Sequence, residues 1–238
     1  MPSVLFVPGA WCPPSLFDPV RLCLAAKGIS SSAIALPSVG GTTATLDDDI
    51  AAVRAELLKY IDEKGEEIIL AAHSYGGVVA SGAAEGLTKN DYEGKGKRGG
   101  VVRIVYMAAF VAPKGASMKQ LFGGEFPPSM RVEDDRVYAV GGADLVFHDI
   151  PPEEQTKWLS VLTYSSLASF NGPATYEPWH TTPSAFIISE EDHAFPPAVQ
   201  EQMAQALGTE SVYRVKGSHS AFLSQPERVA EILEELSK

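Results

Sequence analysis

The chain has 238 residues, and 45% of them are hydrophobic, so it is long and apolar enough to bury a full core as one domain. The net charge of −11 at pH 7 argues against a nucleic-acid partner and against an anionic membrane, because both are bound through Lys and Arg. No stretch approaches the ~20 apolar residues of a membrane helix, so we expect no membrane partner.

The cysteine content and the N-terminus bear on the compartment. Cys12 and Cys23 are the only cysteines, and the first residues lack the charged segment and the apolar length of a signal peptide. We therefore expect a cytoplasmic protein with reduced thiols. The sequence contains no CxxC, HExxH or phosphate-loop pattern, so it predicts no metal and no cofactor.

Short apolar runs alternate with helical patterns along the chain. Strands of a parallel sheet that is covered on both faces are short and almost wholly apolar, which is how these runs read. The predicted strands are 4–7, 32–36, 68–71, 101–107, 184–188 and 212–215. The sequence therefore predicts an α/β fold with a mainly parallel central sheet and helices on both faces.

Two helices are clear from their periodicity. The first follows Thr45 and has apolar residues on one face at 46, 50, 53, 57 and 61. Asp47, Asp48 and Asp49 open it, which suits the positive end of the helix dipole, and we interpret this acidic run as a solvated helix start. The last helix, 226–236, places its apolar residues on one face and closes the final layer of the sheet.

The alternation of strands and helices breaks between the fourth and fifth predicted strands. Residues 113–183, bounded by Pro113 and Pro183 and rich in aromatic residues, are predicted to form an inserted helical cap on a core of 1–112 and 184–238. Within the cap, 118–131 has the composition of a mobile lid lip, although a static loop would look the same. In the core, the Gly- and Lys-rich residues 89–100 predict a mobile surface loop.

Ser74 lies in the most informative motif. An apolar strand leads into Ala72-His73-Ser74-Tyr75-Gly76-Gly77, and small residues follow. A tight turn from strand to helix lifts a serine hydroxyl clear of the backbone, and small neighbours allow this turn. The pattern is A-x-S-x-G, with Ala72 where glycine is usual, and it predicts a nucleophile elbow rather than an ordinary glycine-rich junction.

A serine needs a base to activate it, and five histidines compete for this role: His73, His148, His180, His193 and His219. His73 adjoins Ser74 but would point away from it at a sharp turn, two others lie in the predicted cap, and His193 would face solvent or substrate. His219 follows the last strand, where a loop at the carboxyl edge of the sheet can reach the elbow. We predict His219 as the base.

The acid that orients the base should lie between Ser74 and His219 in the chain. Glu190, Glu191 and Asp192 directly follow a predicted buried strand. We choose Asp192, which lies deepest in the turn, and keep Glu190 as the reserve; loop acids are otherwise mostly solvated surface groups.

Acyl transfer also needs two N–H donors for the developing oxyanion. One is expected from Tyr75, directly after the serine. The other is expected from Ala10, because Pro8 and Gly9 form a tight turn right after the first strand. The alternative for this segment is an ordinary Pro-Gly turn.

Together these motifs resemble the α/β-hydrolase superfamily, in particular small cofactor-free esterases near the plant methyl-esterase and hydroxynitrile-lyase branch. The motifs that carry the resemblance, in chain order, are Pro8-Gly9-Ala10-Trp11, Ala72-His73-Ser74-Tyr75-Gly76-Gly77, Glu191-Asp192-His193-Ala194-Phe195-Pro196-Pro197 and Gly217-Ser218-His219-Ser220-Ala221-Phe222-Leu223. The cap segment 147–154, with Trp158 and 166–168, is similar to bacterial and fungal members of this branch. The resemblance implies an α/β-hydrolase fold over essentially the whole chain.

Two departures from the pattern bear on function. Pro8 stands where relatives usually have a histidine that ties down the oxyanion loop, which leaves the geometry of that loop open. Ser220 stands where hydroxynitrile lyases have a lysine that handles cyanide, so the resemblance does not imply cyanohydrin cleavage.

The expected function is a serine hydrolase that cleaves an ester, thioester or lactone of a small, mainly apolar substrate. Gly9, Trp11, Trp158, Tyr164 and Trp179 are candidate substrate-binding residues, with packing inside the cap as the alternative for the last three. The same scaffold also serves lyases, C–C hydrolases and acyl-transfer cyclases. A ligand-binding protein without turnover is a third alternative, and a homodimer stays open.

Overall fold

The computed structural model describes all 238 residues. The elements of the core, including one 3-10 helix (η1), are β1 (Ser3–Val7), η1 (Pro14–Phe17), α1 (Asp18–Ala26), β2 (Ser31–Ala33), α2 (Leu46–Lys64), β3 (Glu67–His73), α3 (Gly76–Ala83), α4 (Lys89–Glu93), β4 (Gly100–Met107), β8 (Ser184–Ser189), α9 (Pro197–Leu207), β9 (Val212–Val215), α10 (Ala221–Ser224) and α11 (Pro226–Glu235). Between β4 and β8 lie α5 (Met118–Leu121), β5 (Met130–Glu133), β6 (Arg136–Ala139), α6 (Gly142–Val146), α7 (Pro152–Leu159), β7 (Ser165–Ser166), α8 (Leu167–Asn171) and the 3-10 helix η2 (Pro178–His180).

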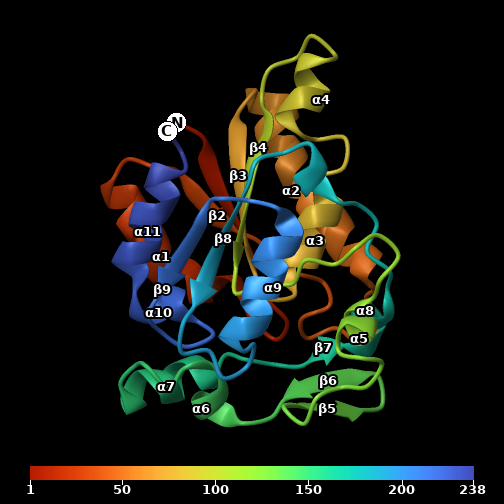
Figure 1. Cartoon of the computed structure of the whole chain (residues 1–238), viewed down its shortest axis with the longest axis vertical. Coiled ribbons are helices and arrows are strands. Elements are labelled where there is room, and N and C mark those ends of the chain that lie inside the picture. The colour runs from red at the N-terminus through yellow and green to blue at the C-terminus, as the bar shows by residue number, and fades with distance from the viewer.

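The central sheet is parallel throughout. Its six strands follow the order β2-β1-β3-β4-β8-β9 (Figure 1). All six predicted strands are present, and only the edge strand β2 differs clearly, since it ends at Ala33 rather than at residue 36. The predicted fold class is confirmed.

The alternation of side chains along each strand divides the core into two layers. Leu5 and Val7 of β1 pack in the cluster that includes α2, α3 and α9. Val4 and Phe6 point to the opposite face and pack with α1, α10 and α11. Strands buried on both faces have no polar side to show, which explains their near-continuous apolar sequence.

Helix α2 forms as its sequence predicts. Thr45 and Asp48 make a capping box, and Gly65 ends the helix with a φ of 67°. The apolar stripe at 46, 50, 53, 57 and 61 is buried, and each such side chain contributes about 1.5–3 kcal/mol. The acidic run differs from the prediction, because Asp47 and Asp48 are exposed but Asp49 is fully buried.

Most of the segment 113–183, from α5 to α8, lies across the lower end of the sheet in Figure 1, where the parallel strands end, and its last residues return to the upper end, where β8 begins. It contains short helices, as predicted, but also an antiparallel sheet of β5, β6 and β7 that the sequence pattern did not reveal. Its buried apolar residues join the two clusters of the core; Val137 and Phe170 belong to one, Phe147 and Trp158 to the other. This segment, called the cap below, therefore shares the core's interior rather than having one of its own.

The predicted loop 89–100 contains a helix, which corrects that prediction. Thr88 and Asp91 form a capping box at the start of α4, and Tyr92 is buried. These local signals outweigh the glycine and lysine content. None of the helices combines the length and the hydropathy that a membrane span requires.

Candidate active site

Ser74 occupies a strained turn between β3 and α3. Its φ is 53°, in the left-handed region that a residue with a side chain rarely adopts, and such a conformation costs about 1–3 kcal/mol. Two hydrogen bonds hold the turn, because the carbonyl of Ser74 accepts the N–H groups of Gly77 and Phe110 at 3.0 and 3.1 Å. This is the geometry of the predicted nucleophile elbow.

Close backbone packing explains the small residues around the elbow. A Cβ atom on Gly76 would lie 2.5 Å from the carbonyl oxygens of both Val7 and Pro8, and one on Gly9 would lie 2.9 Å from the Cβ of Ser74. The start of α3 and the loop after β1 therefore touch without room for a side chain. Gly9 packs against Ser74 and His73, and it does not line the cavity at Ser74.

The loops after β8 and β9 bring Asp192 and His219 together. The Nδ1 of His219 lies 2.7 Å from the Oδ2 of Asp192, and both side chains are buried. Glu190 and Glu191 are exposed. Because an ionised carboxylate only accepts, Nδ1 of His219 carries the proton, which leaves Nε2 able to accept one.

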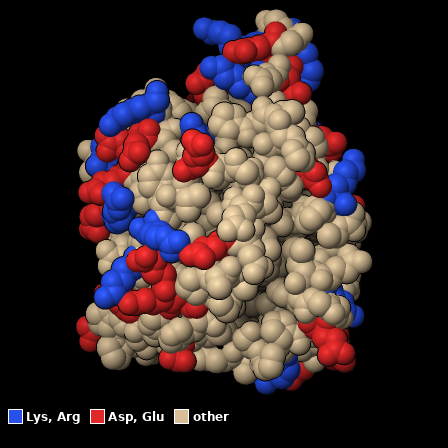
Figure 2. Space-filling view, in the orientation of Figure 1, with Lys and Arg blue, Asp and Glu red and all other residues tan.

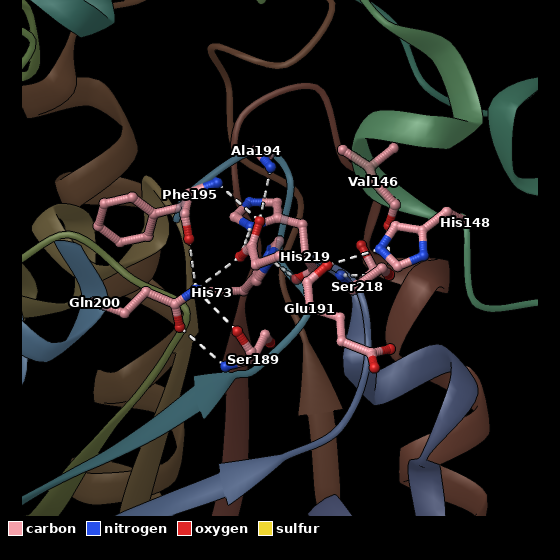
Figure 3. A network of polar contacts seen from close by, with 12 residues as sticks. His73, Val146, His148, Ser189, Glu191, Ala194, Phe195, Gln200, Ser218 and His219 are labelled. Atoms are coloured by element: carbon pink, nitrogen blue, oxygen red, sulfur yellow. Dashed lines mark hydrogen bonds and ion pairs between the residues drawn. The ribbon is translucent and has the colours of Figure 1, made fainter. Parts of the chain in front are cut away.

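Four donors hold the carboxylate of Asp192, and the residues that supply them, Ala194, Phe195, Gln200 and His219, are labelled in Figure 3. Its Oδ1 accepts the N–H groups of Ala194 and Phe195 at 2.8 and 2.7 Å, and its Oδ2 accepts His219 and the Nε2 of Gln200, the latter at 2.9 Å. Gln200 is fully buried, and its Oε1 accepts the N–H of Ser189 at 2.9 Å. Gln200 thus orients Asp192, and no motif in the sequence marks it.

His73 packs against His219. Its Nε2 donates to the carbonyl of His219 at 2.9 Å, and its ring lies against those of His219 and Phe222. Burial, followed by the nearby His219, holds the pKa of His73 well below its ordinary value, so its ring is neutral. As predicted, His73 is turned away from the position of a base, and it fixes the backbone of His219 instead.

The cap also holds the loops of Asp192 and His219. The Oδ2 of Asp149 accepts the N–H of Ser218 at 2.8 Å, and the Oγ of Ser218 donates to the carbonyl of Val146 at 2.8 Å. His148 donates to the carbonyl of Glu191 at 2.7 Å (Figure 3). Residues 146–149 of the cap therefore bridge the loop of Asp192 and the loop of His219.

The loop after β1 is held by Trp11. Trp11 has a φ of 69°, its N–H donates to the Oγ of Ser165 at 2.9 Å, and its Nε1 donates to the carbonyl of Val137 at 2.9 Å. These contacts to β7 and β6 fix a loop that lacks the usual histidine at Pro8. The N–H groups of Ala10 and Tyr75 donate no hydrogen bond within the protein.

Ser74 and His219 meet at a cavity of about 240 Å³. Ser74 and His219 line it, together with the predicted oxyanion residues Ala10 and Tyr75. Most of its wall is apolar and comes from both the core and the cap, and no Lys, Arg, Asp or Glu contributes to it. The wall includes Trp11, Phe110, Met118, Leu121, Phe122, Met130, Leu145, Phe170, Phe195 and Val199, with Ser129 as a further hydroxyl.

The predicted substrate-binding aromatic residues are divided by the structure. Trp11 lines the cavity, whereas Trp158, Tyr164 and Trp179 lie outside it. Trp158 is buried beneath the Nζ of Lys157, and Arg136 lies over the ring of Tyr164. For Trp158 the structure shows packing rather than substrate contact, in the apolar cluster that also includes residues of α1, α10 and α11. The phenylalanines and methionines that do line the cavity belong to no recognisable motif, so the sequence did not identify them.

The fold and site define a class of protein, and sequence comparison identifies the same class. The chain belongs to the alpha/beta hydrolase family, whose family model matches residues 4–232. No group of three or more His, Cys, Asp or Glu side chains is arranged to hold a metal ion.

Individual relatives agree with this assignment. An alpha/beta hydrolase of Aspergillus novofumigatus is 28% identical over 244 residues, which covers 98% of this chain and 95% of that one. Among solved structures, polyneuridine aldehyde esterase has a TM-score of 0.80 at 18% identity and covers 100% of both chains. A methylesterase from Arabidopsis has a TM-score of 0.76 at 18% identity and covers 100% of this chain and 99% of its own. At these identities the two structures show that the fold is shared.

Proposed function

We propose that the protein is a serine hydrolase that cleaves a carboxylic ester, thioester or lactone of a small, mainly apolar substrate. The observation that carries this proposal is the convergence of Ser74 with the hydrogen-bonded pair His219 and Asp192 on one apolar cavity. The esterases among the structural neighbours are consistent with it.

The proposed chemistry gives each of these groups a role. His219 takes the proton of Ser74 as its Oγ attacks the carbonyl carbon, and Asp192 stabilises the imidazolium that forms. The free N–H groups of Ala10 and Tyr75 receive the negative charge on the carbonyl oxygen. His219 then gives its proton to the leaving group, and water, activated by the same histidine, releases the acid from Ser74.

The cavity determines the kind of substrate. Because no Lys, Arg, Asp or Glu side chain faces it, a charged substrate would lose its hydration without gaining a partner. Figure 2 shows charged side chains over the left half of this face, along its right rim and over α4, whereas the area just right of the centre is uncharged and hollowed. We therefore propose an uncharged substrate.

A fluorophosphonate probe tests the mechanism, because it reacts only with an activated serine. Intact-mass measurement should show one adduct on the wild type and none on Ser74→Ala or His219→Ala. Ser160→Ala, which removes an exposed hydroxyl in the cap, should label like the wild type. A folded wild type that takes no label would rule out the acyl-serine and favour a lyase that uses His219 only as a base, or a ligand-binding protein.

A further inference from the structure

Asp49 is a buried carboxylate that the proposed reaction does not use directly. It lies in the first turn of α2, is 0% exposed, and has no cationic partner. Its Oδ1 accepts the N–H of Ser38 at 2.9 Å, and its Oδ2 accepts the hydroxyl of Tyr75 at 2.7 Å. Burial raises the pKa of Asp49, so the charged carboxylate lowers the stability of the fold at neutral pH rather than raising it.

Tyr75 is the residue to which Asp49 connects the site. It directly follows Ser74, and its backbone N–H is one of the two proposed oxyanion donors. Its side chain is held at both ends, because the hydroxyl reaches Asp49 and the ring, 1% exposed, stacks on Phe170 with centroids 5.7 Å apart. A side chain fixed in this way leaves its own backbone little freedom to rotate at the elbow.

The second proposed donor is linked to the same carboxylate. Ser38, which donates to Asp49, accepts the N–H of Ser166 through its carbonyl at 2.9 Å. The neighbouring Ser165 accepts the N–H of Trp11, the residue after Ala10, through its Oγ. The two loops that present the N–H groups of Ala10 and Tyr75 are therefore joined through Ser38 and Asp49.

We propose that Asp49 is a positioning residue that sets the N–H groups of the oxyanion site through the hydroxyl of Tyr75 and the N–H of Ser38. This inference rests on the proposed function. It assigns Asp49 no contact with the substrate. It predicts instead that loss of the contact to Tyr75 weakens binding of the tetrahedral oxyanion and leaves binding of the planar ester unchanged.

The test uses Asp49→Asn and Tyr75→Phe with two matched controls. Asp47→Asn removes an exposed acid from the same helical turn, and Tyr106→Phe removes a buried hydroxyl that contacts Ser81 in the core. For each variant, kcat and KM are measured with a neutral aryl ester. The affinity of a trifluoromethyl ketone is measured as well; Ser74 adds to its carbonyl carbon, the proton moves to His219, and the carbonyl oxygen becomes an oxyanion.

Each of the two variants is expected to lower kcat about tenfold at constant KM, and to weaken ketone binding by the same factor. The double variant should be no worse than the stronger single one, since both substitutions act on the same contact between Asp49 and Tyr75. The controls should keep the kinetic values of the wild type. Asp49→Glu is the conservative variant: it retains two accepting oxygens, whereas Asp49→Asn retains one and turns an N–H donor toward either Ser38 or Tyr75, so Asp49→Glu should lose less.

Two results would overturn the proposal. If thermal stability falls while kcat and ketone affinity of the folded protein stay at wild-type values, Asp49 only supports the fold. If KM rises with kcat unchanged, the contact shapes the cavity rather than the oxyanion site.

Failure of the proposed function is distinguishable from failure of this inference. A wild type that hydrolyses no ester and takes no fluorophosphonate overturns the proposed function, and the role of Asp49 with it. An active wild type with unaffected variants overturns the role of Asp49 alone. Should Asp49→Asn not fold, Tyr75→Phe decides.

Discussion

Gln200 makes four buried hydrogen bonds, to Ser189, Asp192 and Phe195. We predict that Gln200→Met lowers the free energy of unfolding by at least about 2 kcal/mol, because the N–H of Ser189 and the carboxylate of Asp192 lose buried partners. Urea denaturation measures the effect. Gln205→Met, an exposed position on the same helix, should stay within about 0.5 kcal/mol of the wild type, and equal losses in both variants would contradict the argument.

Gly76 is required by the close approach of α3 to β1. Gly76→Ala places a Cβ against the carbonyl oxygens of Val7 and Pro8, and we expect it to lower the free energy of unfolding by about 1–3 kcal/mol. Gly28→Ala is the control, since Gly28 has a positive φ but open space around it and should lose only about 1 kcal/mol. Thermal unfolding of both variants gives the comparison, and a Gly76→Ala variant as stable as Gly28→Ala would refute the steric explanation.

At the scale of elements, Asp149 joins the cap to the loop of His219. Burial alone would raise the pKa of Asp149, but hydrogen bonds from Ser224 and Ser218 outweigh it and hold this pKa below the ordinary 3.8. A carboxyl with a lowered pKa stabilises the fold fully above the ordinary value, and this contribution is lost as the pH falls through the folded value.

Asp149→Asn should therefore destabilise the protein by a constant amount between about pH 5 and 7, and by less as the pH falls below about 4. Urea unfolding across this range measures the difference from the wild type, with Glu154→Gln on the exposed side of α7 as the control. A difference that grows toward acid pH would have the wrong sign and would refute the prediction.

Local sequence patterns predicted the elements that depend on local signals. The six apolar strands, helix α2 with its cap at Thr45, and the turn of Ser74 all rest on neighbouring residues, and the structure has them. The strands β5, β6 and β7 were missed because they have two to four residues each and show no alternation long enough to detect. Helix α4 was missed because its segment is rich in glycine and lysine, which predicts a loop, whereas the capping box of Thr88 and Asp91 starts a helix there.

The site divides in the same way. Asp192 and His219 stand in loops that directly follow strands, so chain order alone brought them to one edge of the sheet. Asp49 and Gln200 are polar residues on helices, and only their burial shows that they face the site. The acidic run 47–49 predicts three exposed side chains, and only the packing of the folded chain shows that Asp49 is buried.

On the scale of the whole molecule, Cys12 should report global unfolding. Burial raises the pKa of the Cys12 thiol to about 12, whereas Cys23 is partly exposed. A thiol-specific disulfide reagent should therefore label Cys23 in the native protein and Cys12 only at the rate of unfolding. Mass spectrometry against increasing urea checks this, and fast labelling of both thiols without urea would contradict it.

The uncharged cavity predicts selectivity between matched esters. An aryl acetate should be hydrolysed with a kcat/KM at least about 100-fold higher than the same ester bearing a ring carboxylate, because burying an unpaired carboxylate costs several kcal/mol. Steady-state kinetics on the pair provides the measurement, with hydroxide-catalysed hydrolysis as the reference for intrinsic reactivity. Comparable values for the two esters would show that the substrate does not enter this cavity.

The hydrogen bonds from Trp11 to β6 and β7 also bear on how such enzymes can diversify. A cap that touched only substrate could be exchanged between relatives as an independent module, and the exchange would change what is bound but not how fast it reacts. Here the cap strands hold the loop of Ala10 through Trp11, and the cap residue Asp149 holds the loop of His219. A chimera with a foreign cap should therefore lose turnover even on substrates that its new cavity accommodates, unless the partners of Trp11 and Ser218 are transplanted with it.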